Sequence, residues 1–149
     1  MSERDQVVME VLHALRSISD AMDRMHGLVG ADMELNTTDL RAMRMLIIRE
    51  QSAQTTSPHE LARHLRISTA STSKLVDRLA AAGHVERSPH PRDRRARVVT
   101  LTDESKRSFF QHYGGHLGVM RGVAERYDEA DLRVISRFLD ELAVEIDPQ

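Results

Sequence analysis

The segment from residue 57 to residue 102 constrains the fold most, because its local signals specify two short helices and then a hairpin. Ser57, Pro58 and Glu60 form the best helix start in the chain: a capping serine, a proline at the first helical position and the glutamate of a capping box. The helix that begins here is short and is predicted to end around residues 66–67. A turn follows it directly.

A second helix is predicted behind this turn. Ser68 caps it, it covers residues 69–82, and Gly83 fits a left-handed C-terminal cap. Its apolar positions share one side: Leu75, Val76 and Leu79. Two short helices joined by a tight turn are a helix-turn-helix signature.

A β-hairpin is predicted next. Residues 84–87 are typical of a short strand, and residues 97–101, with apolar residues alternating inward, are typical of its partner. The nine residues 88–96 connect the strands as a loop that a Pro-x-Pro sequence stiffens.

This hairpin is unusually rich in arginine. Five arginines fall within eleven residues, and only Asp93 offsets them: Arg87, Arg92, Arg94, Arg95 and Arg97. Residues 57–102 carry nine Lys/Arg against four Asp/Glu, whereas the rest of the chain carries twelve against nineteen, so the net charge of −2 hides a basic segment. This asymmetry indicates a polyanion-binding face. A solvated arginine-rich loop is the alternative.

Helices are predicted on both sides of this segment. A long amphipathic helix runs from about Val8 to Met25 and is expected to end near Gly27 and Gly30, and another begins at a cap-like sequence, residues 36–39. After the hairpin, residues 102–104 cap a helix in which Gly114, Gly115 and Gly118 predict a kink or a weak point.

The last predicted helix starts at Asp128. One stripe holds its apolar residues: Leu132, Ile135, Phe138, Leu139, Leu142 and Ile146. The apolar faces of the two end helices are wider than one thin core covers, which predicts a subunit interface. The fold class is therefore mainly α with a small β-hairpin.

Composition excludes several kinds of protein. The 149 residues, about one domain, include no cysteine, so disulfides, thiol nucleophiles and thiolate zinc sites are excluded. No apolar run approaches a membrane span and the N-terminus is charged, so a cytoplasmic setting is expected. An aromatic content of 3% without tryptophan argues against a stacking platform for single strands. No catalytic motif is present, so an enzyme is not expected.

Two stretches resemble the MarR family of bacterial transcriptional regulators. Asp93-x-Arg95-x-x-x-Val99-x-Leu101-Thr102 is similar to the family's D-x-R-x-x-x-[VL]-x-L-T pattern, and residues 75–87 are similar to its recognition helix and first wing strand. Ser105 departs from the glycine of many members. The resemblance covers nearly the whole chain and implies one domain over residues 1–149. It would hold a winged helix-turn-helix DNA-binding region in residues 36–102 and dimerisation helices in residues 5–30 and 105–146.

The resemblance implies roles for the hairpin, which is the wing. Arg95, together with Arg94, is expected to enter the minor groove of double-stranded DNA, with Asp93 orienting the arginine beside it. A narrow minor groove attracts guanidinium groups because its negative potential is enhanced. Arg92 and Arg97 are expected to meet phosphate. The alternative is that Asp93 and Arg95 only stabilise the turn.

The second helix of the helix-turn-helix is expected to read the major groove. Short polar side chains let a helix approach the bases closely, and one cluster provides them: Thr69, Ser71, Thr72, Ser73 and Lys74. Ser71, Thr72 and Lys74 are assigned base or phosphate contacts, and Arg78 a phosphate contact. The alternative for each serine or threonine is that it only caps the helix or lies on its surface. A homodimer would present two such helices to a pseudo-palindromic DNA site. Bound there, it is expected to act as a repressor of transcription.

Two further sites are considered. Many relatives of this family release DNA on binding phenolic or anionic effectors, which suggests a pocket lined by seven residues: Met22, Met25, His26, Met43, Ile47, Phe109 and Tyr113. Plain core packing is the alternative. His112 and His116, spaced i, i+4, are weak zinc candidates that His26, Asp32 or Glu34 would have to complete. No cofactor or membrane partner is expected.

Two alternative functions remain open at this point. One is a zinc-responsive regulator of the same fold. The other is a winged helix that only binds proteins, although that function does not need an arginine-tipped wing.

Overall fold

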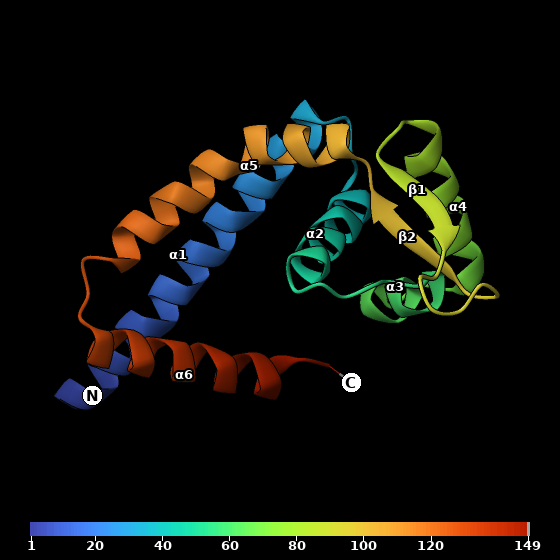
Figure 1. Ribbon diagram of the computed structural model, residues 1–149. Coiled ribbons are helices and arrows are strands. Elements are labelled where there is room, and N and C mark those ends of the chain that lie inside the picture. Colours follow the sequence, from blue (N-terminus) through green and yellow to red (C-terminus); the bar gives the residue numbers. More distant parts are fainter. Residues whose placement is uncertain (149) are drawn as a thin grey trace. The chain divides into compact units, whose positions relative to one another are not determined.

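The computed structural model describes residues 1–148 and divides into two compact units, Met1–His112 and Tyr113–Gln149 (Figure 1). The elements are α1 (Glu3–Asp32), α2 (Thr37–Gln51), α3 (Pro58–Leu65), α4 (Thr69–Ala81), β1 (Val85–Pro89), β2 (Arg97–Leu101), α5 (Asp103–Ala124) and α6 (Glu129–Ile146). The predicted class, mainly helical with one small hairpin, is confirmed. Helix α5 begins in the first unit and ends in the second.

The helix starts that the sequence predicts are confirmed, because each depends on a capping side chain. Asn36, Ser57, Ser68 and Asp128 all occupy N-cap positions and accept a backbone N–H from the residue three positions later. At the starts of α2 and α3 the capping box is complete, with both reciprocal hydrogen bonds formed.

Helix α1 ends near Gly30, as predicted, but the glycines do not end it. The helix continues through Gly27 and Gly30 to Asp32, and the left-handed residue that follows is Glu34, with φ of 58°. Gly30 instead serves a close approach: Leu35 N–H donates to its carbonyl at 2.7 Å, and a Cβ on Gly30 would lie 2.9 Å from the Leu35 carbonyl oxygen. The chain needs glycine here for space, not for termination.

The wing is longer at its first strand than predicted. Strand β1 extends to Pro89, which pairs with Arg97 in an antiparallel register, so the connecting loop shortens to residues 90–96. Proline is tolerated at this last position because a strand end need not donate a ladder hydrogen bond. The wing is also tied to the body, since Val99 N–H in β2 donates to the Thr56 carbonyl at 2.8 Å.

The core of the first unit lies between α2, α3, α4 and the wing. Its fully buried side chains come from all of these elements: Met43, Leu46, Leu61, Leu75, Val76, Leu79, Val85 and Val99. Each apolar side chain of this size contributes about 1.5–3 kcal/mol when fully buried. The helix-turn-helix and the wing thus share one packed base.

Helix α5 is unbroken through Gly114, Gly115 and Gly118, so the glycines do not interrupt it as the predicted weak point would. A Cβ at any of the three would meet nothing within 4 Å. Helix α6 begins at its Asp128 cap and contains no buried residue. No helix within residues 1–148 is long and apolar enough to cross a membrane.

Candidate nucleic-acid interface

Helix α4 presents one buried and one exposed side, as a reading helix requires. Leu75, Val76 and Leu79 face the core. The exposed side carries four of the predicted contact residues: Thr69, Ser71, Ser73 and Lys74. The Ser68 cap holds the first turn of α4 in place, because its Oγ accepts the Ser71 N–H at 3.0 Å and donates to Ser71 Oγ at 2.9 Å.

Thr72 must be withdrawn from the predicted DNA contacts. It is only 1% exposed, and its hydroxyl donates to the Ser68 carbonyl at 2.9 Å. The helical rotation places it on the same side as Leu75 and Val76, which the run of short polar residues in the sequence did not reveal. Its role is to pack the first turn of α4 against the core.

Two ion pairs fix α4 to its neighbours. Arg78 donates to the nearly buried carboxylate of Asp39 at 2.6 Å, which joins α4 to the first turn of α2. Arg87, in β1, donates to Asp77 at 2.6 Å and joins the wing to α4. Arg78 therefore has a structural partner that the predicted phosphate contact did not include, although 54% of its side chain remains exposed.

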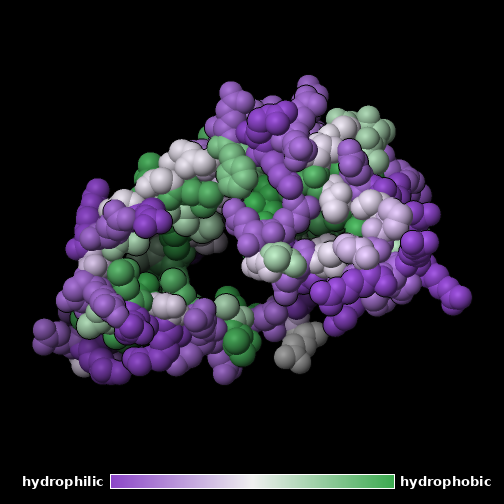
Figure 2. All heavy atoms as spheres, viewed as in Figure 1, coloured by the Kyte–Doolittle hydropathy of each residue, from purple (hydrophilic) through white to green (hydrophobic). Residues whose placement is uncertain are grey.

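The other four arginines of the hairpin have different surroundings. Arg92, Arg94, Arg95 and Arg97 are all exposed, and none makes an ion pair with another residue in the described part of the chain. Figure 2 shows that the surface at the wing end of the first unit is mostly hydrophilic. Unneutralised guanidinium groups on a projecting loop provide a polyanion-binding surface.

Asp93 organises the backbone of the wing loop. Its Oδ1 accepts the Arg95 N–H at 3.0 Å, and its carbonyl accepts the Ala96 N–H at 3.1 Å. The carboxylate thus positions Arg95 through the main chain, by forming a turn. Within residues 1–148 it forms no ion pair with an arginine side chain.

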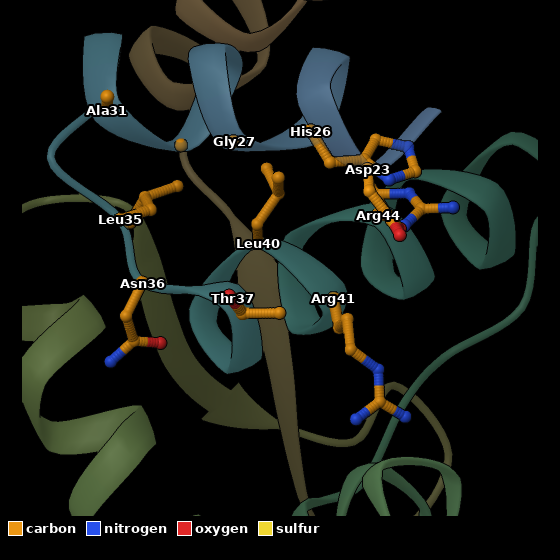
Figure 3. Close-up of a pocket in the computed structure, with 11 residues that line it drawn as sticks. Asp23, His26, Gly27, Ala31, Leu35, Asn36, Thr37, Leu40, Arg41 and Arg44 are labelled. Carbon is orange, nitrogen blue, oxygen red and sulfur yellow. The ribbon is translucent and has the colours of Figure 1, made fainter. Parts of the chain in front are cut away.

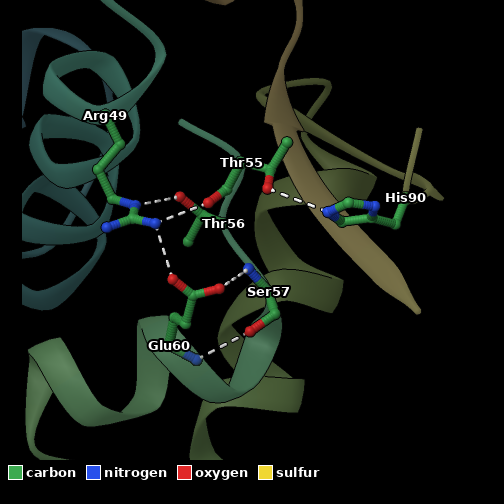
Figure 4. A network of polar contacts seen from close by, with 6 residues as sticks. All are labelled: Arg49, Thr55, Thr56, Ser57, Glu60 and His90. Carbon is green, nitrogen blue, oxygen red and sulfur yellow. Dashed lines mark hydrogen bonds and ion pairs between the residues drawn. The ribbon is translucent and has the colours of Figure 1, made fainter. Parts of the chain in front are cut away.

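A polar network supports the base of the wing (Figure 4). Arg49, near the end of α2, donates to Thr56 Oγ1 at 2.8 Å, to the Thr55 carbonyl at 2.7 Å and to Glu60 Oε2 at 2.7 Å. Thr55 Oγ1 lies 3.5 Å from His90 Nε2 in the wing loop. The network lets α2, α3 and the wing share one set of hydrogen bonds, and sequence spacing alone gave no sign of it.

A basic cavity that the sequence did not predict lies between α1 and α2. Its volume is about 720 Å³, and Asp23 and His26 from α1 and Arg41 and Arg44 from α2 line it (Figure 3). Partial burial lowers the pKa of His26, the positive charge of Arg44 lowers it further, and Asp23 opposes both effects. The cavity thus favours a neutral imidazole beside two guanidinium groups.

The seven residues predicted to line an effector pocket differ from the lining of this cavity. Of the seven only His26 lines this cavity. Met43, Ile47 and Phe109 are core residues, with exposures of 0%, 7% and 3%. Of the three methionines, Met43 packs in the core, whereas Met22 and Met25 are half-buried.

The histidine pair has one acidic neighbour. His112 Nδ1 lies 3.9 Å from Asp32 Oδ2. Within residues 1–148 no group of three or more histidine, aspartate or glutamate side chains could hold a metal ion. The shell that the zinc interpretation required is not assembled by these residues.

The fold and the arginine-tipped wing define a winged helix-turn-helix protein, and comparison with known proteins places it more narrowly. Residues 34–96 match the model of the MarR family. Over 86 residues, 58% of this chain, the sequence is 33% identical to the HTH-type transcriptional repressor YetL of Bacillus subtilis (strain 168). That match spans only about half of the relative, 52% of its length.

Solved structures agree in fold along nearly the whole chain. A MarR family protein from Bacillus stearothermophilus superposes with a TM-score of 0.68 at 21% identity and covers 98% of both chains. A mutant of MepR from S. aureus, solved bound to an oligodeoxyribonucleotide, gives a TM-score of 0.60 at 14% identity and covers 92% of this chain and 98% of its own. The family model thus matches the segment from residue 34 to residue 96, and the solved structures show that the whole chain shares the fold of MarR family proteins.

Proposed function

We propose that the protein is a transcriptional regulator that binds specific double-stranded DNA sequences as a homodimer and represses the genes that follow. The observation that carries this proposal is the group of exposed arginines at the wing tip, Arg92, Arg94, Arg95 and Arg97, which lack ion pairs within the described residues. A relative, YetL, is named a transcriptional repressor, and a protein of the same fold was solved bound to an oligodeoxyribonucleotide.

In this proposal α4 enters the major groove and the wing follows the minor groove. The major groove, about 12 Å wide, admits a helix, and the minor groove, about 6 Å wide, admits only a narrow hairpin. Ser71, Ser73 and Lys74 reach base edges or phosphate from α4. Arg94 and Arg95 occupy the minor groove, while Arg92 and Arg97 meet phosphate.

The homodimer is proposed from the apolar surface of the end helices. In a single copy α1 exposes Val8, Val11, Leu12 and Ile18, each by 39% or more. In α6, Ile135, Phe138 and Leu139 are exposed by 37–46%. Contiguous apolar surface of this kind marks association sites, so residues 5–26 and 128–146 are proposed to pair with a second copy and to present two α4 helices one DNA turn apart.

Regulation by a small molecule is also proposed, at the cavity between α1 and α2. Arg41 and Arg44 would bind a small anion such as an aromatic carboxylate, and Leu35 and Leu40 on the cavity wall would contact its ring. Binding there would act on α2, the helix that carries Asp39 and through it Arg78 of α4. The enzyme and protein-only alternatives gain no support from a specific feature of the structure.

The wing assignment is tested by neutralising it. Arg94 and Arg95 are exposed, so changing both to alanine should leave the melting temperature and the oligomeric state unchanged while DNA affinity falls by about tenfold to a hundredfold. The slope of log affinity against log salt should also decrease, by about one to two units, because an interface with two fewer cations releases fewer counterions from the DNA.

The matched control is Arg121→Ala on α5, which removes a paired, exposed arginine of equal charge. It should leave DNA affinity unchanged. If the double wing variant bound DNA as tightly as the wild type, the wing would be a solvated loop and the proposal would fail.

A further inference from the structure

His90 lies in the wing loop, and its side chain contacts both the loop and the body of the protein. Its Nδ1 accepts the backbone N–H of Arg92 at 3.0 Å and that of Asp93 at 3.3 Å. An imidazole nitrogen accepts hydrogen bonds only when it carries no proton. In the neutral ring the proton therefore resides on Nε2, which faces Thr55 Oγ1 at 3.5 Å (Figure 4).

These contacts define the shape of the arginine loop. The His90 side chain satisfies two amides in the first half of the loop, and Asp93 satisfies that of Arg95 in the second half. The loop closes behind them, where His90 N–H donates to the Ala96 carbonyl at 2.9 Å. Without the imidazole acceptor, the amides of residues 92 and 93 would have only water as a partner, and the arginines would lose their common support.

The contact with Thr55 connects the loop to a rigid part of the molecule. Arg49 holds the Thr55 carbonyl, and the next residue, Thr56, accepts the Val99 N–H of β2. His90 thus touches the same connection that anchors the second wing strand. A cavity of about 580 Å³ opens beside it, between this connection and the loop.

We propose that His90 is a positioning residue of the DNA interface: its neutral imidazole holds the wing loop in the shape that inserts into the minor groove, and a proton on Nδ1 releases that loop. This role rests on the proposed function, since it concerns the same wing. Histidine is the side chain whose charge changes between about pH 5 and 8. The wing would therefore lose its sequence preference when this proton binds.

The two backbone N–H donors, and not the charged neighbours, oppose a proton on Nδ1, because the charges near His90 are of both signs. Arg49 from α2, Glu60 from α3 and Arg92 from the loop line the cavity beside His90. The Glu60 carboxylate is already paired with Arg49 at 2.7 Å, and Asp93 is engaged by the Arg95 amide. A proton on Nδ1 would face the backbone N–H groups of Arg92 and Asp93, which could no longer donate to it.

Protonation also adds a positive charge to the wing, which strengthens contact with any duplex. Two duplexes separate this effect from the release of the loop: a preferred sequence and a scrambled one of equal length. The added charge acts on both alike, so the ratio of the two affinities reports the shape of the wing.

The variants His90→Asn and His90→Ala test the proposal, with His59→Asn on the exposed side of α3 as control. Asparagine offers a carbonyl oxygen that can accept the two amides and does not titrate. At pH 8 the alanine variant should lose roughly fivefold to tenfold in the affinity ratio, and the asparagine variant should keep it. Between pH 8 and 5.5 the ratio should fall for the wild type and His59→Asn but stay constant for His90→Asn.

A second measurement uses the free protein. In NMR spectra, the amide signals of Arg92 and Asp93 should move with the same midpoint as the His90 ring as the pH falls. The role of His90 would be overturned if the two amide signals did not change with the His90 ring. It would also be overturned if the affinity ratios of the wild type and His90→Asn changed with pH in parallel. Either result would leave the proposed DNA binding intact. A wild type that prefers no duplex at pH 8 would overturn the proposed function itself.

Discussion

Several helices in this protein end at a residue with a left-handed backbone conformation, and the type of that residue does not usually indicate it. Four helices end in the same motif, with a left-handed residue just beyond the helix: Glu34, Ala53, Arg66 and Gly83. After α2, for example, Ala53 N–H donates to the Glu50 carbonyl and Gln54 N–H donates to the Arg49 carbonyl. Only one of the four is a glycine, and the sequence predicted a left-handed cap at that end alone.

Helix starts could be predicted because their signal is local. Ser57 and Glu60 carry the whole capping box within four residues. The burial of Thr72 was missed, although helical spacing from Leu75, Val76 and Leu79 places it on their side of α4. The ion pairs of Arg78 and Arg87 could not be predicted. Tertiary packing brings their partners, Asp39 and Asp77, to them from other elements.

Gly30 and Gly27 give opposite predictions one turn apart in α1. Gly30→Ala should lower the free energy of unfolding by about 1–3 kcal/mol, because its Cβ would meet the Leu35 carbonyl at 2.9 Å. Gly27→Ala should raise it by about 0.5–1 kcal/mol, since a Cβ there meets nothing and alanine favours the helix. Urea unfolding measures both. Equal effects would show that Gly30 makes no close approach to the Leu35 carbonyl.

At the scale of elements, α2 concentrates positive charge that the sequence reading overlooked. Arg41, Arg44 and Arg49 lie along one side of this helix, and His64 of α3 faces them. Partial burial lowers the pKa of His64, and the three arginines lower it further. The charge of residues 57–102 does not indicate the basic side of α2, because α2 precedes that segment. The arginines of α2 also alternate with core residues in the sequence.

The lowered pKa values of His26 and His64 predict how stability depends on pH. Below about 6.5, the ordinary value, the unfolded chain binds protons on these groups that the folded chain does not. Stability should therefore decrease as the pH falls from 6.5 and level off once both groups are protonated in the fold. Solvent exposure of His64 keeps the effect small.

Melting curves between pH 7.5 and 5 measure this dependence. The variant His64→Gln should show a shallower decrease than the wild type, and His59→Gln, on the exposed side of α3, should match the wild type. An equal slope in all three proteins would contradict the proposed charge environment of His64.

At the scale of the whole molecule, a single copy of the chain leaves the apolar faces of its two end helices, α1 and α6, largely exposed. Helix α6 has no buried residue, and α1 buries only Val29 and Gly30 at its last turn. The width of these apolar faces could be read from the sequence as a subunit interface. Which residues of two copies meet could not, since no local pattern specifies a partner.

Leu139→Asp should weaken the proposed dimer. A carboxylate buried in an apolar interface without a partner is strongly unfavourable, so we expect the dimer to dissociate at concentrations at least about a hundredfold higher than for the wild type. Sedimentation equilibrium measures this. Glu141→Gln, a charge change on the same helix, is the control, and a Leu139→Asp protein of unchanged mass would place the interface elsewhere.

Selection of bound sequences from a random pool of duplex DNA by the purified protein tests the central claim most directly. A regulator with two α4 helices and two arginine wings should enrich a two-fold symmetric sequence with half-sites about 34–36 Å apart, one helical turn. Recovery of no preferred sequence, with binding that disappears at physiological salt, would contradict a sequence-specific DNA-binding function.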